Sequence, residues 1–170
     1  MTLLEWGALG ELIGGVAIIG SLIYVGVQVK DSAKATRSAA ANDATVSMQT
    51  WYLETGSNRQ TSELWLNAMR SPEPLSTHDE FQFLMLMHAV FLGFQNSYLL
   101  SQEGTLDPEI RKALTFAIIA VKDLPGMGRY WRQRRGFLHS GFANYVDGLL
   151  LQDAIETLDV YKRNENASDT

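Results

Sequence analysis

The chain contains no cysteine among its 170 residues. This absence excludes disulfide bonds, thiolate nucleophiles, iron–sulfur clusters and every zinc site that uses cysteine ligands. The chain also lacks a basic excess, since its 14 Lys and Arg residues are outnumbered by 19 Asp and Glu residues, which gives a formal net charge of −5. Because a surface that binds nucleic acid is usually basic, we expect no nucleic-acid partner.

Catalytic and metal-binding motifs are missing as well. None of the three histidines, His78, His88 and His139, belongs to a His-Glu-x-x-His or Glu-x-x-His pattern, the usual source of metal ligands on helices. No Gly-x-Ser-x-Gly motif presents a nucleophilic serine, and no glycine-rich loop precedes the Lys-Ser/Thr pair that binds phosphate. The sequence therefore predicts no catalytic residue, no metal site and no cofactor.

A long uncharged run lies near the N-terminus, from Leu12 to Val29. As a helix it would span about 27 Å, close to the ~30 Å hydrocarbon core of a bilayer. The positive charges follow the run instead of preceding it, which disfavours a cleaved signal peptide. We predict a transmembrane helix within residues 1–30, with a buried core helix and a signal peptide as the alternatives.

The charges on the two sides of this run are asymmetric. Glu5 and Glu11 lie on the N-terminal side, whereas Lys30, Lys34 and Arg37 follow the run. An excess of Lys and Arg marks the cytoplasmic flank of a membrane helix. The chain should therefore cross the membrane once, in contact with lipid, with its N-terminus outside and the rest of the chain in the cytoplasm.

One face of the predicted membrane helix carries small residues. They follow one another at steps of three and four positions: Gly7, Gly10, Gly14, Ala17 and Ser21. Helices associate in lipid through close backbone approach and polar contacts, because lipid tails solvate large apolar side chains as well as another helix does. This face predicts a homo-oligomer whose copies touch through these five residues.

Two polar residues, Glu11 and Gln28, lie on the same side of the helix. An acidic residue facing lipid at the centre of a span costs ~2.5–3.5 kcal/mol, and burial against copies of the helix avoids that cost. A ring of Glu11 and Gln28 side chains would line a pore in such an oligomer. The alternative is that the carboxylate of Glu11 simply reaches the water among the lipid headgroups.

The membrane helix should continue beyond the bilayer as a helical stalk, residues 31–56. No Pro or Gly interrupts the segment from Val27 to Thr55, and alanine is frequent in it. One face of the stalk carries Ala40, Ala44, Met48 and Trp51. This face predicts that close packing between copies continues below the membrane.

The remaining sequence predicts a small all-α bundle, residues 57–162, and a disordered tail, residues 163–170. Capping residues, Pro and Gly divide the bundle into helices, and no strand pattern of useful length is present. The expected helices run from Thr61 to Arg70, from Ser76 or Thr77 to about Gln102, from Pro108 to about Lys122, from Arg129 to about Arg135, and from a Ser140 cap to Tyr161, with a turn at Leu124-Pro125-Gly126. Since Phe81 to Gln102 holds no Asp, Glu, Lys or Arg, the second of these helices is interpreted as the core helix, with a second membrane span as the alternative.

Four arginines lie within seven residues, interleaved with Tyr130 and Trp131: Arg129, Arg132, Arg134 and Arg135. Such a cluster predicts contact with an anionic lipid headgroup or another anionic ligand. The alternative is a solvated face, in which the two aromatic rings pack inward and the guanidinium groups pair with acidic side chains of the same chain.

Several short sequence stretches resemble those of a known protein family. They are acid-Leu-Ile-Gly-Gly near the start, then Gly20-Ser21-Leu22-Ile23-Tyr24-Val25 with Gln28 and Lys30, Glu103-Gly104-Thr105-Leu106-Asp107, Pro125-Gly126 before Tyr130-Trp131, and Phe142 with Tyr145-Val146-Asp147. On these residues, from about position 5 to 151, the chain resembles a widespread bacterial family of uncharacterised single-span membrane proteins with an α-helical cytoplasmic domain. The resemblance implies this architecture and no catalytic residues.

Together these observations favour a homo-oligomeric scaffold or interaction protein of the bacterial inner membrane, without catalytic activity and with a further protein partner left open. Two alternatives remain. One is an ion channel or pore lined by the polar side of the N-terminal helix. The other is a helical ligand sensor, whose pocket would gather polar groups around His88, Gln95 and Asn96.

Overall fold

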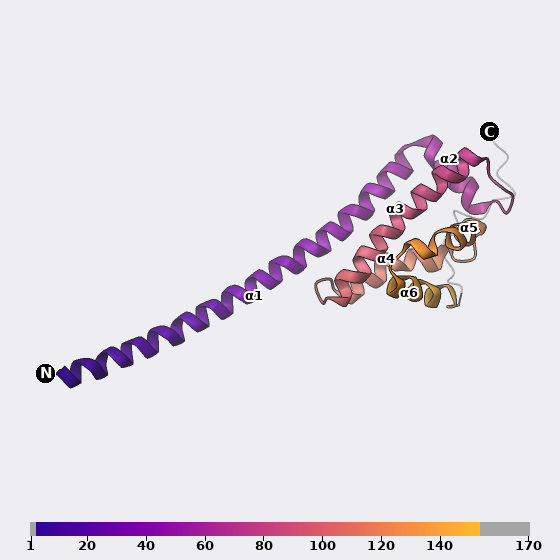
Figure 1. Ribbon diagram of the computed structural model, residues 1–170. Coiled ribbons are helices and arrows are strands. Elements are labelled where there is room, and N and C mark those ends of the chain that lie inside the picture. The colour runs from indigo at the N-terminus through magenta and orange to yellow at the C-terminus, as the bar shows by residue number, and fades with distance from the viewer. Residues whose placement is uncertain (1–2, 154–170) are drawn as a thin grey trace. The chain divides into compact units, whose positions relative to one another are not determined.

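The computed structural model describes residues 3–153, and all of the regular secondary structure in them is helical, which confirms the all-α prediction of a long N-terminal helix followed by a bundle (Figure 1). Its elements are α1 (Leu3–Ser57), α2 (Arg59–Arg70), α3 (Thr77–Gln102), α4 (Pro108–Val121), α5 (Pro125–Arg134), the short 3-10 helix η1 (Arg135–Phe137) and α6 (Ser140–Leu150).

The chain divides into two compact units, and the division falls inside α1. The first unit ends at Ala39 and the second begins at Ala40. The predicted stalk, residues 31–56, is therefore split between them, and its second part belongs to the bundle.

Side-chain caps explain where the helices of the bundle begin. The side chain of Asn58 accepts a hydrogen bond from the amide of Thr61 at the start of α2. Ser76 accepts one from the amide of Asp79 at the start of α3, and Asp107 accepts one from the amide of Glu109 at the start of α4. These caps satisfy amides that the first turn of a helix leaves unpaired.

Two of the predicted helices have different bounds in the structure. The turn expected at Leu124-Pro125-Gly126 is instead the beginning of α5, which starts at Pro125, four residues before the predicted Arg129. Proline suits the first helical position because it has no amide hydrogen to leave unpaired and its φ is already helical.

The last helix also differs from its prediction. Ser140 is the first residue of α6 and not its cap, since His139 occupies the capping position. The helix ends at Leu150 instead of Tyr161, and Leu151 beyond it is 87% exposed. Because Leu151 is so exposed, continuation of the helix through it gains little from packing. The rest of the predicted helix and the predicted tail, residues 163–170, lie outside the described residues.

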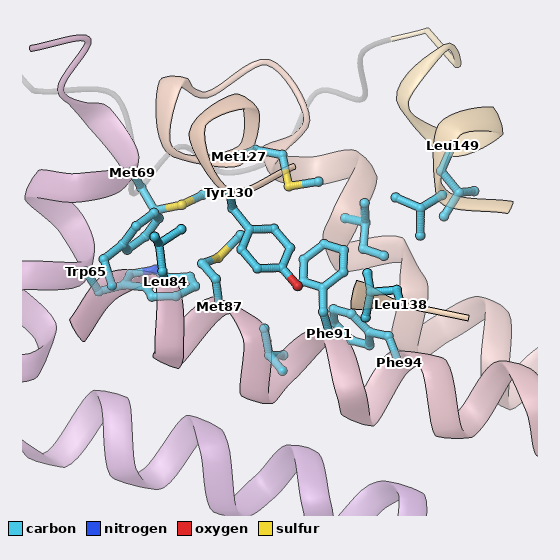
Figure 2. Close-up of a cluster of buried hydrophobic side chains, with 14 of the residues drawn as sticks. Trp65, Met69, Leu84, Met87, Phe91, Phe94, Met127, Tyr130, Leu138 and Leu149 are labelled. Carbon is cyan, nitrogen blue, oxygen red and sulfur yellow. The ribbon is translucent and has the colours of Figure 1, made fainter. Parts of the chain in front are cut away.

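The core of the bundle forms around α3, which contacts α2, α4, α5 and α6. Figure 2 shows the ring of Tyr130 of α5 next to Met87 and Phe91 of α3. The ring of Phe91 lies 4.6 Å from that of Tyr130 between centroids. The uncharged helix is thus packed within the bundle, as the core-helix interpretation requires.

The end of α1 packs on the bundle of the same chain. Ala40, Ala44 and Met48 are buried, at 8%, 4% and 4% exposure. A Cβ atom at Gly93 of α3 would lie 2.5 Å from Cε of Met48, and the indole of Trp51 donates a hydrogen bond to the carbonyl of Leu86 at 3.2 Å. The prediction that this face contacts other copies is therefore wrong, because the chain's own α3 is in contact with it.

Candidate functional site

The described residues of the N-terminal part of α1 are exposed. Within the described residues, its most apolar window contains no buried residue, and Leu12, Val16 and Ile19 are 69%, 64% and 60% exposed. A soluble protein rarely leaves a continuous apolar surface of this extent in water. By length and composition, this helix is able to cross a membrane.

The small-residue face is open along this helix. A Cβ atom added at Gly7, Gly10 or Gly14 would meet nothing within 4 Å. The hydroxyl of Ser21 donates to the carbonyl of Ala17 at 2.8 Å. Because this bond is made within the helix, Ser21 needs no polar partner from another helix in a lipid environment. Close packing of another helix on this face would therefore depend on the small size of these residues and not on the polarity of Ser21.

Glu11 and Gln28, the two polar residues predicted for a ring or pore, are both exposed on the same helix. No hydrogen bond or ion pair to either is found in the described part of the chain. The ring or pore formed by these two residues stays a prediction.

Arg129 is part of the interior and does not face solvent. It is 8% exposed, and its guanidinium donates to the carbonyls of Ala68 at 2.9 Å, Ser71 at 3.1 Å and Glu73 at 2.8 Å. The carbonyls at the end of α2 have no helical partner of their own, and a cation is favourable at the negative end of a helix. Arg129 therefore fixes α5 to the end of α2.

Gly126 makes this junction possible. A Cβ atom at its position would lie 2.6 Å from the carbonyl oxygen of Ala68 and 2.6 Å from Cα of Met69. Both are backbone atoms, which cannot turn aside as a flexible side chain would. The close approach of α5 to α2 thus requires glycine here.

The other three arginines of the cluster have separate surroundings. Arg135 forms an ion pair with Asp147 at 2.6 Å, and the indole of Trp131 donates to the same carboxylate at 2.9 Å. The hydrogen bond from Arg135 holds the pKa of Asp147 below its usual value. Arg134 lies 5.2 Å above the ring of Phe137, and Arg132 is exposed. The four side chains do not converge on one anion site, since Arg129 points into the protein and Arg135 is paired.

The polar residues predicted to converge in a ligand pocket do not do so. Nδ1 of His88 lies 3.1 Å from the hydroxyl of Tyr130, with which it shares a hydrogen bond. The side chain of Gln95 accepts a hydrogen bond from the amide of His139 at 2.6 Å, and Asn96 is exposed. His88 holds α3 to α5, and Gln95 holds α3 to the start of α6.

Burial affects the two partners of the first pair in opposite directions. It raises the pKa of Tyr130 well above its usual range and, together with the positive charge of Arg134, lowers the pKa of His88. Both groups are therefore neutral near pH 7. No cluster of three His, Asp or Glu side chains that would hold a metal ion occurs within the described residues.

Sequence reasoning missed an apolar pocket in the bundle. Its volume is about 80 Å³, and residues from α1, α2, α3 and α4 line it. No single motif marks these residues, because they come from four helices that are far apart in the sequence. The neighbouring aromatic residues Trp51 and Tyr52, at the end of the uninterrupted stalk, are the one sequence signal near it.

No family model matches this chain, and no curated protein or solved structure matches it. The family resemblance noted from the sequence stays a prediction.

Proposed function

We propose that this protein is a membrane-anchored interaction protein: α1 crosses the bacterial inner membrane once, copies associate, and the helical bundle is displayed in the cytoplasm as a docking platform. The observation that carries this proposal is the uncovered apolar segment of α1, none of whose most apolar window is buried. In water this segment would expose large aliphatic side chains over most of its circumference, whereas a bilayer solvates them.

A binding role fits the bundle better than a catalytic one. The polar side chains that the sequence singled out are engaged within the fold: Arg129 with carbonyls, Arg135 with Asp147, and His88 with Tyr130. A catalytic group must instead be free to reach a reacting atom. We therefore propose that the bundle works through its surface and its association with other molecules.

Extraction of cell membranes tests the anchor. We expect the full chain to stay in the membrane pellet in alkaline carbonate and to be released by detergent. The double substitution Ile19→Asp and Leu22→Asp should abolish retention in the membrane pellet, because each central acidic residue costs ~2.5–3.5 kcal/mol of insertion free energy. Phe81→Asp with Leu92→Asp, at exposed positions of α3, is the matched control. Wild-type protein in the carbonate supernatant would refute the anchor.

The orientation can be measured because the chain has no native cysteine. A single cysteine introduced as Thr2→Cys should react with a membrane-impermeant maleimide in intact spheroplasts. A cysteine introduced as Glu103→Cys should react only after permeabilisation. The reverse pattern would place the bundle outside the cytoplasm and contradict the assigned orientation.

Cross-linking in nanodiscs tests the association of copies. Gly10→Leu with Gly14→Leu should reduce the cross-linked species, since large side chains on the small-residue face prevent close backbone approach. Gly15→Leu with Gly20→Leu, on the opposite face of the same helix, is the control. Equal cross-linking in the two double variants would show that copies do not meet through the small-residue face.

A further inference from the structure

The apolar pocket lies where the end of α1 meets the bundle. Its lining residues are Trp51 and Tyr52 of α1, Trp65 of α2, Met87, Val90, Phe91 and Phe94 of α3, and Ala117, Ile118 and Val121 of α4. All of them belong to the second compact unit. The pocket is therefore a property of the bundle and does not depend on the membrane anchor proposed above.

The walls of the pocket are held in place by contacts among the lining residues and by a hydrogen bond to a residue outside it. The indole of Trp51 is fixed by its hydrogen bond to Leu86 and packs edge-on against Trp65, with ring centroids 4.8 Å apart. On the other wall, Phe91 packs against Phe94 at 5.7 Å. Side chains anchored in this way cannot rotate inward to fill the space, so the pocket persists.

The chemistry of the lining selects an uncharged, apolar occupant. No charged side chain lines the pocket, and the Nε1–H group of Trp51 already donates to a carbonyl. Water in a cavity needs two to four polar partners, and an apolar cavity instead takes up apolar molecules. The side chain of Tyr52 is 57% exposed and provides a polar group where the pocket meets solvent.

The size of the pocket narrows the class of ligand. A dry apolar cavity of about 150 Å³ accommodates one benzene ring, and this pocket has a volume of about 80 Å³. An aromatic ring is thus too large, whereas a few methylene groups fit. We propose that the pocket binds the end of an unbranched aliphatic chain, whose polar end stays in solvent near Tyr52.

Tryptophan quenching in the full chain tests this proposal. The probe is hexanoate carrying bromine on its terminal carbon, because bromine quenches an indole that it touches and the carboxylate keeps the probe in water. Trp6→Phe is used as the background, since Trp6 lies in α1 and does not line the pocket. In nanodiscs, the probe should quench Trp51 and Trp65 saturably.

Two alanines on α4 supply a matched pair of variants. Ala117 lines the pocket, whereas Ala113, one turn earlier, is exposed. Ala117→Leu should weaken the apparent affinity for the probe about tenfold, as expected when about two methylene groups lose their burial. Ala113→Leu should leave it unchanged. Val121→Leu is a second, smaller filling substitution should Ala117→Leu alter the fold, as judged by circular dichroism.

The outcomes distinguish a specific aliphatic site from non-specific quenching, and a membrane lipid from a free fatty acid. Saturable quenching that the filling substitutions weaken supports an aliphatic site, and equal quenching in the Ala113→Leu and Ala117→Leu proteins overturns it. Nanodisc lipids brominated in their acyl chains distinguish the source. Quenching by these lipids that Ala117→Leu removes assigns the chain end to a membrane lipid, and quenching by the soluble probe alone assigns it to a free fatty acid. The absence of quenching by both refutes the site.

Discussion

Two helices of this protein, α1 and α3, are long and apolar enough to cross a membrane, yet their surroundings differ. In α3, 39% of the most apolar window is buried inside the bundle, and in α1 none of it is. The aromatic residues of α3 pack against rings from α5 and α6. The aliphatic residues of α1 from Leu12 to Val29 have no such neighbours in the described chain. Similar composition thus forms a protein core in one helix and, in the other, an uncovered surface for which we propose contact with lipid.

The comparison also applies within α1 itself. Small residues follow one another on one face near the N-terminus and again at Ala40 and Ala44. The second group is covered by the bundle of the same chain, whereas the first is open. A row of small residues therefore indicates that another helix packs closely, without indicating whether that helix belongs to the same chain.

The largest expected effect contrasts one core residue with one residue of the uncovered segment. Phe91→Ala should reduce the free energy of unfolding of the bundle by about 3–5 kcal/mol, because the ring is 2% exposed and leaves a cavity. Ile19→Ala should change it by less than about 0.5 kcal/mol. Urea unfolding in nanodiscs, followed by tryptophan fluorescence, measures both. Similar losses would mean that the first unit also has a packed protein neighbour.

The next effect concerns the buried cation. Arg129→Met should cost about 3 kcal/mol, since three carbonyls lose a charged donor and at least one stays buried without a partner. The control is Arg132→Met on the same helix, where an exposed side chain is removed and the change should stay within about 0.5 kcal/mol. If the two variants unfold at the same urea concentration, Arg129 does not stabilise the junction of α2 and α5.

A smaller loss is expected from one methyl group. Gly126→Ala should destabilise the bundle by about 1–3 kcal/mol, because the added Cβ collides with backbone atoms of α2. Gly14→Ala, in the uncovered part of α1, should leave the thermal transition of the bundle unchanged, since nothing lies within 4 Å of its Cβ position. An unchanged transition in both proteins would show that α2 and α5 are able to separate at no cost.

The smallest effect is a dependence on pH. Burial and Arg134 lower the pKa of His88 in the folded chain, so the unfolded chain binds more protons once the pH falls below about 6.5. The bundle should lose stability as the pH decreases from there toward the lowered pKa, and this group should contribute no change above that window. Urea midpoints at several pH values, compared with His88→Gln, measure it. The substitution should make the urea midpoint less dependent on pH. An unaltered slope of midpoint against pH would exclude His88 as the origin of the dependence.

Local chemistry explains which parts of the fold were predictable. Ser76, Asp107 and Pro108 act within one turn of their own position, so the starts of α3 and α4 follow from the sequence. The end of α6 at Leu150 was not predictable in this way. By composition the residues after it are compatible with a helix, whereas the exposed Leu151 offers little packing that would favour its continuation.

The candidate sites show the same division. The exposed apolar segment of α1 was predictable, because the length of an uncharged run can be read from the sequence without knowledge of tertiary contacts. The arrangement of the arginine cluster was not predictable, because Arg129 is buried and donates to a carbonyl at the end of α2, about sixty residues earlier in the chain. The pocket was missed for a related reason, because its lining comes from four separate helices.

The sequence by itself determined the helical class, the uncovered apolar helix and the capped starts of α3 and α4, because periodicity, caps and uncharged length act over a few turns of chain. The tertiary structure decided which side chains are buried, which arginine faces inward, and where an apolar pocket stays open. These depend on contacts between residues distant in sequence, and such contacts exist only once the helices have packed.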